Sequence, residues 1–157
     1  MSFYLLCKLL HILSSTVLFG TGLGSAFYMW QAHRSNDMQL LARVAGSVVL
    51  ADWIFTTPAV IAQPVTGVAM VLQGGFGWHA SWLQLALALY VLIGCCWLPV
   101  VFLQIQVRDM AVAAAGSGET PDPRLGKYMR YWYALGWPAF LGVIVIFALM
   151  VFKPVLW

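Results

Sequence analysis

Charged residues are scarce in this sequence, and their scarcity excludes most classes of soluble protein. Lysine, arginine, aspartate and glutamate make up 8% of the 157 residues, whereas a soluble domain has about 25%. So few charges cannot cover the surface of a soluble domain, and an apolar content of 62% excludes intrinsic disorder. Three cysteines, an odd number, exclude a disulfide scaffold. The chain is therefore predicted to be an integral membrane protein.

The sequence also lacks the common catalytic motifs. It contains no hydrolase triad pattern, phosphate-binding loop, H-E-x-x-H motif or carboxylate pair. No basic patch alternates with aromatic residues that would stack on bases, so nucleic acid is not an expected partner. Whether the protein is an enzyme is left open, because any enzymatic chemistry would need a bound cofactor.

Four apolar stretches are each long enough to cross a bilayer. A hydrocarbon core of about 30 Å needs about 20 residues of helix, and backbone polar groups in lipid must bond within that helix. The predicted fold is therefore all-α, a polytopic membrane four-helix bundle that forms a single domain over residues 1–157. The first stretch is expected to be a retained span rather than a cleaved signal peptide. The predicted spans are residues 3–30, 44–73, 81–107 and 131–152.

Positive charges predict the orientation of the bundle. Two of the three loops carry lysine and arginine, whereas the loop 74–80 carries none. By the positive-inside rule the two basic loops face the cytoplasm, so both termini face outside, N-out and C-out. We expect a multi-pass protein of the bacterial inner membrane, with the lipid bilayer as its first partner. The basic residues are Arg34, Arg43, Arg108, Arg124, Lys127 and Arg130.

Small residues occur in two places with different expected roles. Residues 111–126 are rich in glycine, proline and charge, and are predicted to form an exposed, mobile loop. In the first span, Gly20 and Gly24 form a G-x-x-x-G pair, which is typical of close helix packing. This pair favours either a homo-oligomer or a place in a larger membrane complex.

His11 is the most informative polar residue of the first span. Lys8 and Ser15 lie about one turn away from it on the same helix face. An ionisable residue inside a span is costly and suggests a function. The imidazole is either a metal ligand, a haem ligand or a proton carrier, or else a neutral ring bonded to a neighbouring helix. The sequence leaves these alternatives open.

The second span carries a polar stripe that is predicted to face the bundle interior. The stripe consists of Asp52, Thr56, Ala59, Gln63 and Thr66 or Gly67. We expect Asp52 to pair with Arg43, Arg130 or an aromatic hydroxyl. In the outer half, a candidate pocket would bring together Lys8, His11, Gln63, Thr66 and Gln84. Met70 is the best candidate for a soft axial ligand there.

Several segments resemble known membrane families. LLHIL at 9–13, TGVAM at 66–70 and WLQLAL at 82–87 resemble the first three spans of HemJ-type protoporphyrinogen oxidases and CopD copper-resistance proteins. DWIFTTPAV at 52–60, QPVTG at 63–67, GWPAF at 136–140 and KP at 153–154 are more similar to a family of predicted integral membrane proteins (domain of unknown function 2269). This resemblance covers nearly the whole chain and implies the four-helix fold.

The resemblance to the HemJ-type family implies a cofactor. It implies that His11 binds haem b, with Gln84 at the position where that family has a lysine. Haem binding with a redox role is therefore the first functional hypothesis, in which the iron is five-coordinate, is also bound by Met70, or is shared with a second subunit. The alternatives are a non-enzymatic structural or accessory subunit and, more weakly, copper handling through Met70 and His79.

Overall fold

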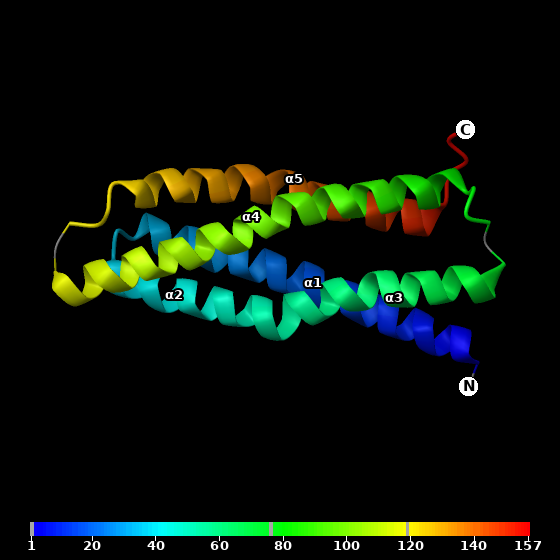
Figure 1. Cartoon of the computed structure of the whole chain (residues 1–157), viewed down its shortest axis with the longest axis horizontal. Helices are drawn as coiled ribbons and strands as arrows, with labels where there is room; N and C mark the ends of the chain where they lie inside the picture. Colours follow the sequence, from blue (N-terminus) through cyan, green and yellow to red (C-terminus); the bar gives the residue numbers. More distant parts are fainter. Residues whose placement is uncertain (1, 76, 119) are drawn as a thin grey trace.

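The computed structural model describes residues 2–75, 77–118 and 120–157, and these form a long helical bundle (Figure 1). Five α-helices and one π-helical turn make up its secondary structure. They are α1 (Phe3–Arg34), α2 (Met38–Ala51), η1 (Asp52–Thr56), α3 (Thr57–Gly74), α4 (Ser81–Ser117) and α5 (Arg124–Phe152). The all-α four-helix membrane bundle predicted from the sequence is confirmed.

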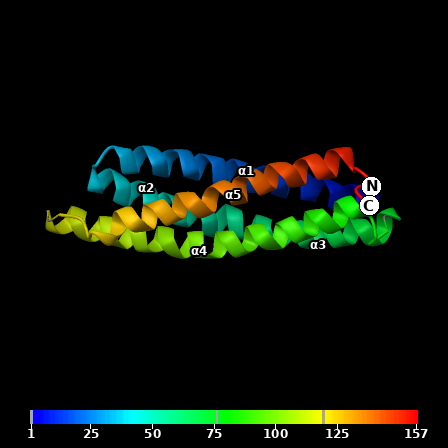
Figure 2. The same ribbon diagram turned by 90° about the horizontal axis from the view of Figure 1, so that it is seen from above.

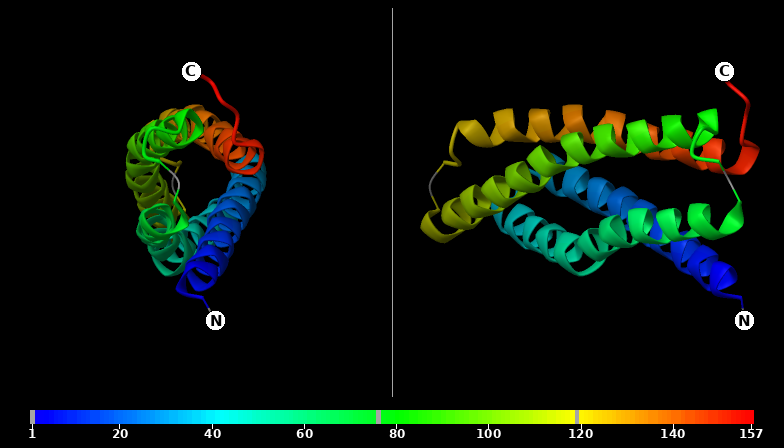
Figure 3. Two further views of the ribbon diagram at one scale, coloured as in Figure 1. Left: turned by 90° about the vertical axis from the view of Figure 1, so that its right-hand side faces the viewer. Right: turned by 45° about the vertical axis from the view of Figure 1, so that its right-hand side comes forward.

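The segments α2, η1 and α3 are continuous and form one span, so the chain has four candidate membrane spans. At 1.5 Å per residue, the 37 residues from Met38 to Gly74 extend about 55 Å, well beyond a hydrocarbon core of about 30 Å. This helix bends between its two parts, where the π-helical turn is followed by Pro58 (Figure 3). A widened turn and a proline are the usual causes of such a kink.

The two ends of the bundle differ in what they contain. One end holds the segments 35–37 and 120–123, and the other holds the segment 77–80 and both ends of the described chain (Figures 1 and 2). We call the corresponding parts of the molecule the basic half and the terminal half. The termini lie at one end because four spans cross an even number of times, and their predicted placement outside the cell stays a prediction.

Local sequence signals set several helix ends. The Asp37 side chain accepts hydrogen bonds from the backbone N–H of Gln39 and Leu40, at 2.8 and 3.0 Å, and caps α2. Gly75 and Gly118 end α3 and α4 with φ angles of 67° and 70°, a left-handed conformation that glycine adopts without strain.

The helices are longer than the predicted spans, chiefly at the basic end. The residues predicted to form a mobile loop, 111–126, are in part helical, because α4 continues to Ser117 and α5 begins at Arg124. Glu119, inside that predicted loop, lies outside the described residues. Hydropathy detects only the apolar part of a helix, whereas the backbone ladder continues into the polar ends.

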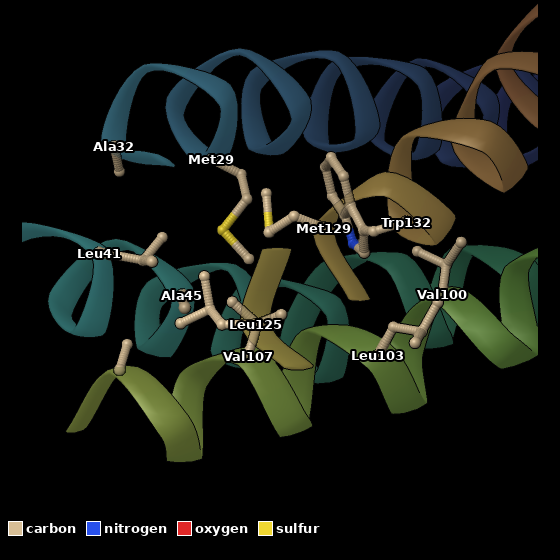
Figure 4. Packing of buried hydrophobic residues seen from close by; sticks show 11 residues of the cluster. Met29, Ala32, Leu41, Ala45, Val100, Leu103, Val107, Leu125, Met129 and Trp132 are labelled. Atoms are coloured by element: carbon tan, nitrogen blue, oxygen red, sulfur yellow. The ribbon is translucent and has the colours of Figure 1, made fainter. Parts of the chain in front are cut away.

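The hydrophobic core lies in the basic half. α1, α2, α4 and α5 all contribute to it, and Figure 4 shows Met29 of α1 and Met129 of α5 within it. The cluster consists of Met29, Ala32, Leu41, Ala45, Val100, Leu103, Val107, Ala111, Leu125, Met129 and Trp132. In the terminal half, by contrast, α1 packs on α3 and α4 packs on α5. The Tyr90 hydroxyl of α4 donates to the carbonyl of Val60 and links these two pairs.

Candidate functional site

His11 and Thr66 meet where α1 packs against α3 in the terminal half. The His11 Nδ1 atom lies 2.9 Å from the Thr66 hydroxyl oxygen. That hydroxyl has a single proton, which it donates to the carbonyl of Ala62 at 2.6 Å. With that proton on the carbonyl, the hydroxyl can accept a hydrogen bond from Nδ1, which is the arrangement of the Nδ1–H tautomer of His11. The lone pair is then on Nε2, the ring atom that can bind a metal.

Two further contacts position the imidazole. The Gln63 amide of α3 donates to the backbone carbonyl of His11 at 2.8 Å and to the Ser14 hydroxyl at 2.6 Å. The ring also rests against Gly67, where an added Cβ would lie 3.5 Å from the His11 Cε1 atom. The His11 site, by which we mean His11, Ser14, Gln63, Thr66 and Gly67, is therefore a set of interlocked contacts between two helices.

The structure brings together only part of the predicted pocket. His11, Gln63 and Thr66 share the contacts described above, whereas the side chains of Lys8 and Gln84 are exposed and Met70 is half-buried. Among the described residues, no hydrogen bond joins Lys8, Met70 or Gln84 to the His11 site. The helical spacing predicted Ser15 as the serine beside His11. Ser15 instead donates to the carbonyl of Ile12, and Ser14 is the serine that contacts the Gln63 amide. Both are about one turn from His11, and only the crossing of α1 and α3 selects between them.

The polar stripe of the second span does face the interior. Asp52, Thr56, Ala59 and Thr66 are buried and Gln63 is half-buried. Asp52, however, has different partners from those expected. Its carboxylate accepts hydrogen bonds from the Thr56 hydroxyl at 2.7 Å and from the amide of Gln104 on α4, rather than from Arg43 or Arg130. Both arginines are exposed, because each lies near the polar end of its helix.

Gln104 is a functional candidate that sequence reasoning missed. It is 1% exposed, and its Oε1 accepts the indole N–H of Trp132 on α5 at 3.3 Å. Trp132 itself is a buried residue of the hydrophobic core. A glutamine surrounded by apolar residues in the third span was the only available signal, and its partners come from two other helices.

Gly20 and Gly24 do not pack against another helix backbone in the described chain. A Cβ added at either position would meet nothing within 4 Å. Both glycines line a cavity of about 470 Å³ between α1 and α2, together with Tyr28, Arg43 and Ser47. The helix contact predicted from this pair is therefore absent within the described part of one chain.

The described residues contain no group of three or more His, Cys, Asp or Glu side chains that could hold a metal ion. The three cysteines are free thiols: Cys7 is buried, Cys95 exposed and Cys96 half-buried. His79, the other histidine considered for copper, is exposed in the segment 77–80. Among the described residues of the His11 site, the one ring atom left to bind a metal is thus Nε2 of His11.

The comparisons with known proteins give one match. The model of a family described as "Predicted integral membrane protein (DUF2269)" matches residues 5–154. No curated protein and no solved structure matches the chain. The more distant resemblance to the HemJ-type and CopD families stays a prediction.

Proposed function

The chain belongs to this family of predicted integral membrane proteins, and we propose that it binds haem b through His11 as a redox protein of the bacterial inner membrane. The family match and the helix lengths establish a more general statement, that the protein is a multi-pass membrane protein with four candidate spans. The single observation that carries the proposal is the hydrogen bond of 2.9 Å between His11 Nδ1 and the Thr66 hydroxyl.

This hydrogen bond supports ligation for a general reason. A histidine that binds a metal nearly always donates its other ring N–H to an oxygen, which fixes the ring and increases its basicity. Thr66 supplies that oxygen, and the Gln63 amide holds the backbone on which the ring is mounted. His11 is thus oriented as a ligand before any iron is bound, without a charged partner.

The absence of a larger ligand group among the described residues favours haem over a bare ion. Haem iron is held by four porphyrin nitrogens and needs only one or two protein ligands, whereas copper or zinc sites need several. His11 would hold the iron, with Thr66 as its hydrogen-bond acceptor. Bound haem would supply one-electron chemistry, and the chain would supply ligation and an apolar setting.

Optical spectroscopy of the purified protein tests the proposal. The chain is produced with a haem supply, purified in detergent, and measured as a reduced-minus-oxidised difference spectrum. We expect a Soret band and an α-band that are lost in His11→Ala and kept in His79→Ala, which removes the exposed loop histidine. The absence of these bands, or bands unchanged in His11→Ala, would rule the proposal out.

A second variant separates ligation from folding. Thr66→Val keeps the shape of the side chain but removes the acceptor for Nδ1–H. Loss of such a second-shell partner typically weakens metal binding about 10–100-fold. We expect weaker haem retention in Thr66→Val, with a haem-free protein that still folds and is destabilised by only about 1 kcal/mol, the cost of one lost hydrogen bond. Equal haem retention in both proteins would contradict the assigned role of Thr66.

One observation favours a second candidate function, a non-enzymatic accessory subunit. The open space beside Gly20 and Gly24 gives α1 a small-residue face that another helix would fill. Gly24→Leu should then abolish cross-linking to a partner copy or subunit in native membranes without altering the haem spectrum. A cross-linking pattern that Gly24→Leu leaves unchanged would exclude this interface.

A further inference from the structure

The carboxylate of Asp52 is held in a fixed orientation by a chain of hydrogen bonds. The indole of Trp132 can only donate, so the Gln104 atom that faces it must be Oε1. This directs the Gln104 NH₂ group toward Asp52, where it donates to one carboxylate oxygen. The Thr56 hydroxyl donates to the other oxygen at 2.7 Å. Both carboxylate oxygens therefore accept hydrogen bonds.

Asp52 forms no ion pair within the described part of the chain. The ion pairs there are Arg108–Asp109, within α4, and Arg124–Asp122, at the start of α5. Asp52 is 8% exposed and lies eight residues inside the predicted start of its span, about 12 Å along the helix. A buried charge in such surroundings is costly unless a partner of opposite sign is present.

A cavity of about 380 Å³ lies beside the carboxylate, between the second span and α4. Its polar lining residues are Asp52, Thr57 and Gln104, and the tryptophans Trp53 and Trp97 also line it. Indole faces attract cations, most strongly where water is excluded. The other lining residues are mostly aliphatic or aromatic, and the exposed side chains of Trp53 and Phe102 set the cavity at the lipid-facing surface.

The backbone is irregular at this same position. The π-helical turn η1 begins at Asp52 and ends at Thr56, so the residue that carries the charge and its hydroxyl donor bound the widened turn. Such turns cost stability relative to regular α-helix and occur frequently at functional sites.

We propose that this cavity is a binding site for amphipathic organic cations, whose positive charge pairs with Asp52 and whose apolar body packs between Trp53 and Trp97. The ligand class is an ammonium or phosphonium group on a hydrophobic body that enters from the lipid. A single carboxylate with apolar walls suits such a cation better than a metal ion, which needs several oxygen ligands. This site is independent of the His11 site, since Asp52 and Gln63 are separated by about 16 Å along the helix.

Binding of tetraphenylphosphonium tests the proposal. The haem-free chain is placed in phosphatidylcholine nanodiscs, and equilibrium dialysis compares them with empty nanodiscs. We expect saturable binding that weakens at least tenfold in Asp52→Asn and is unchanged in Asp109→Asn, which removes an exposed carboxylate. Tetraphenylborate, an anion of nearly the same shape, should show no saturable binding. Equal binding by Asp52→Asn, or equal binding of the anion, would overturn the proposal.

Further variants keep the test decisive if Asp52→Asn does not fold. Trp97→Leu leaves the hydrogen bonds of Asp52 intact and should weaken tetraphenylphosphonium binding several-fold, whereas Trp137→Leu on the lipid-facing side of α5 should not. Equal affinities of these two variants would contradict the site. His11→Ala should bind the cation as the unchanged chain does, so this result stands whether or not haem binds.

Discussion

The basic half and the terminal half of this bundle use polar groups in different ways. In the basic half, Trp132, Gln104 and Asp52 come from three helices and are buried beside a packed core. In the terminal half, His11 and Gln63 link only α1 to α3 and remain half-buried. Three helices supply the first cluster and two supply the second. A polar group is thus shielded according to how many helices meet around it.

Removal of the central amide in each half should show the largest contrast. Gln104→Leu leaves a buried carboxylate without one donor and the Trp132 indole without its acceptor, and should cost about 3 kcal/mol of unfolding free energy. Gln63→Leu removes contacts that are only half-buried and should cost about 1 kcal/mol. Unfolding in mixed detergent micelles, followed by circular dichroism, measures both. Equal losses would show that the two halves shield polar groups alike.

Truncation of apolar side chains should give a smaller contrast. Met129 is 0% exposed in the core, and Met129→Ala should cost about 2 kcal/mol through the cavity it leaves. Leu72 is 71% exposed to lipid in the terminal half, so Leu72→Ala should change the unfolding free energy by less than about 0.5 kcal/mol. The same micelle unfolding assay applies. A large effect of Leu72→Ala would reveal a partner that covers this face.

Two glycines show the opposite pattern, with tight packing in the terminal half and open space in the basic half, and therefore test the comparison. Gly142 in the terminal half is tightly packed, since an added Cβ would lie 2.9 Å from the Cδ1 atom of Ile93, whereas Gly24 in the basic half faces open space. Gly24→Ala should stabilise the protein by up to about 1 kcal/mol through helix propensity. Gly142→Ala should be near neutral or destabilising, because the Ile93 side chain must move. Thermal unfolding midpoints that rise equally would contradict this.

The smallest effect concerns an exposed pair at the basic end. The side chain of Arg124 donates hydrogen bonds to Asp122 and, with its backbone N–H, holds the pKa of that carboxyl below its usual range. A carboxyl with a lowered folded-state pKa contributes stability above its unfolded pKa and loses it as pH falls through the folded value. Carbon NMR titration of Asp122 should show this lowered pKa, and Arg124→Gln should raise it. A pKa that Arg124→Gln does not move would refute the assignment.

Much of the fold was predictable because the hydropathy and spacing of individual residues along the chain already indicate spans and helix faces. Apolar length indicated four spans, and helical spacing placed Asp52, Thr56 and Thr66 on one inward stripe. The predicted ends were too short, because charged residues after Val107 and before Tyr131 still form helix. In the site, His11 and Thr66 were identified, but Ser14 and Gln104 were missed because their partners lie at least 28 residues away along the chain.

The sequence by itself therefore determined that this protein is helical, lies in the membrane and has its polar stripe turned inward, because hydropathy and helical period are local properties. Only the tertiary structure decided which groups meet: Thr66 with the His11 ring, and Gln104 rather than an arginine with Asp52. Those pairings depend on the crossing and relative height of helices far apart in the chain. Apolar side chains pack without directional preference, so their pattern in the sequence does not specify how far one helix is shifted along another. Hydrogen bonds have fixed donors and acceptors, so they show this shift once the helices are in place.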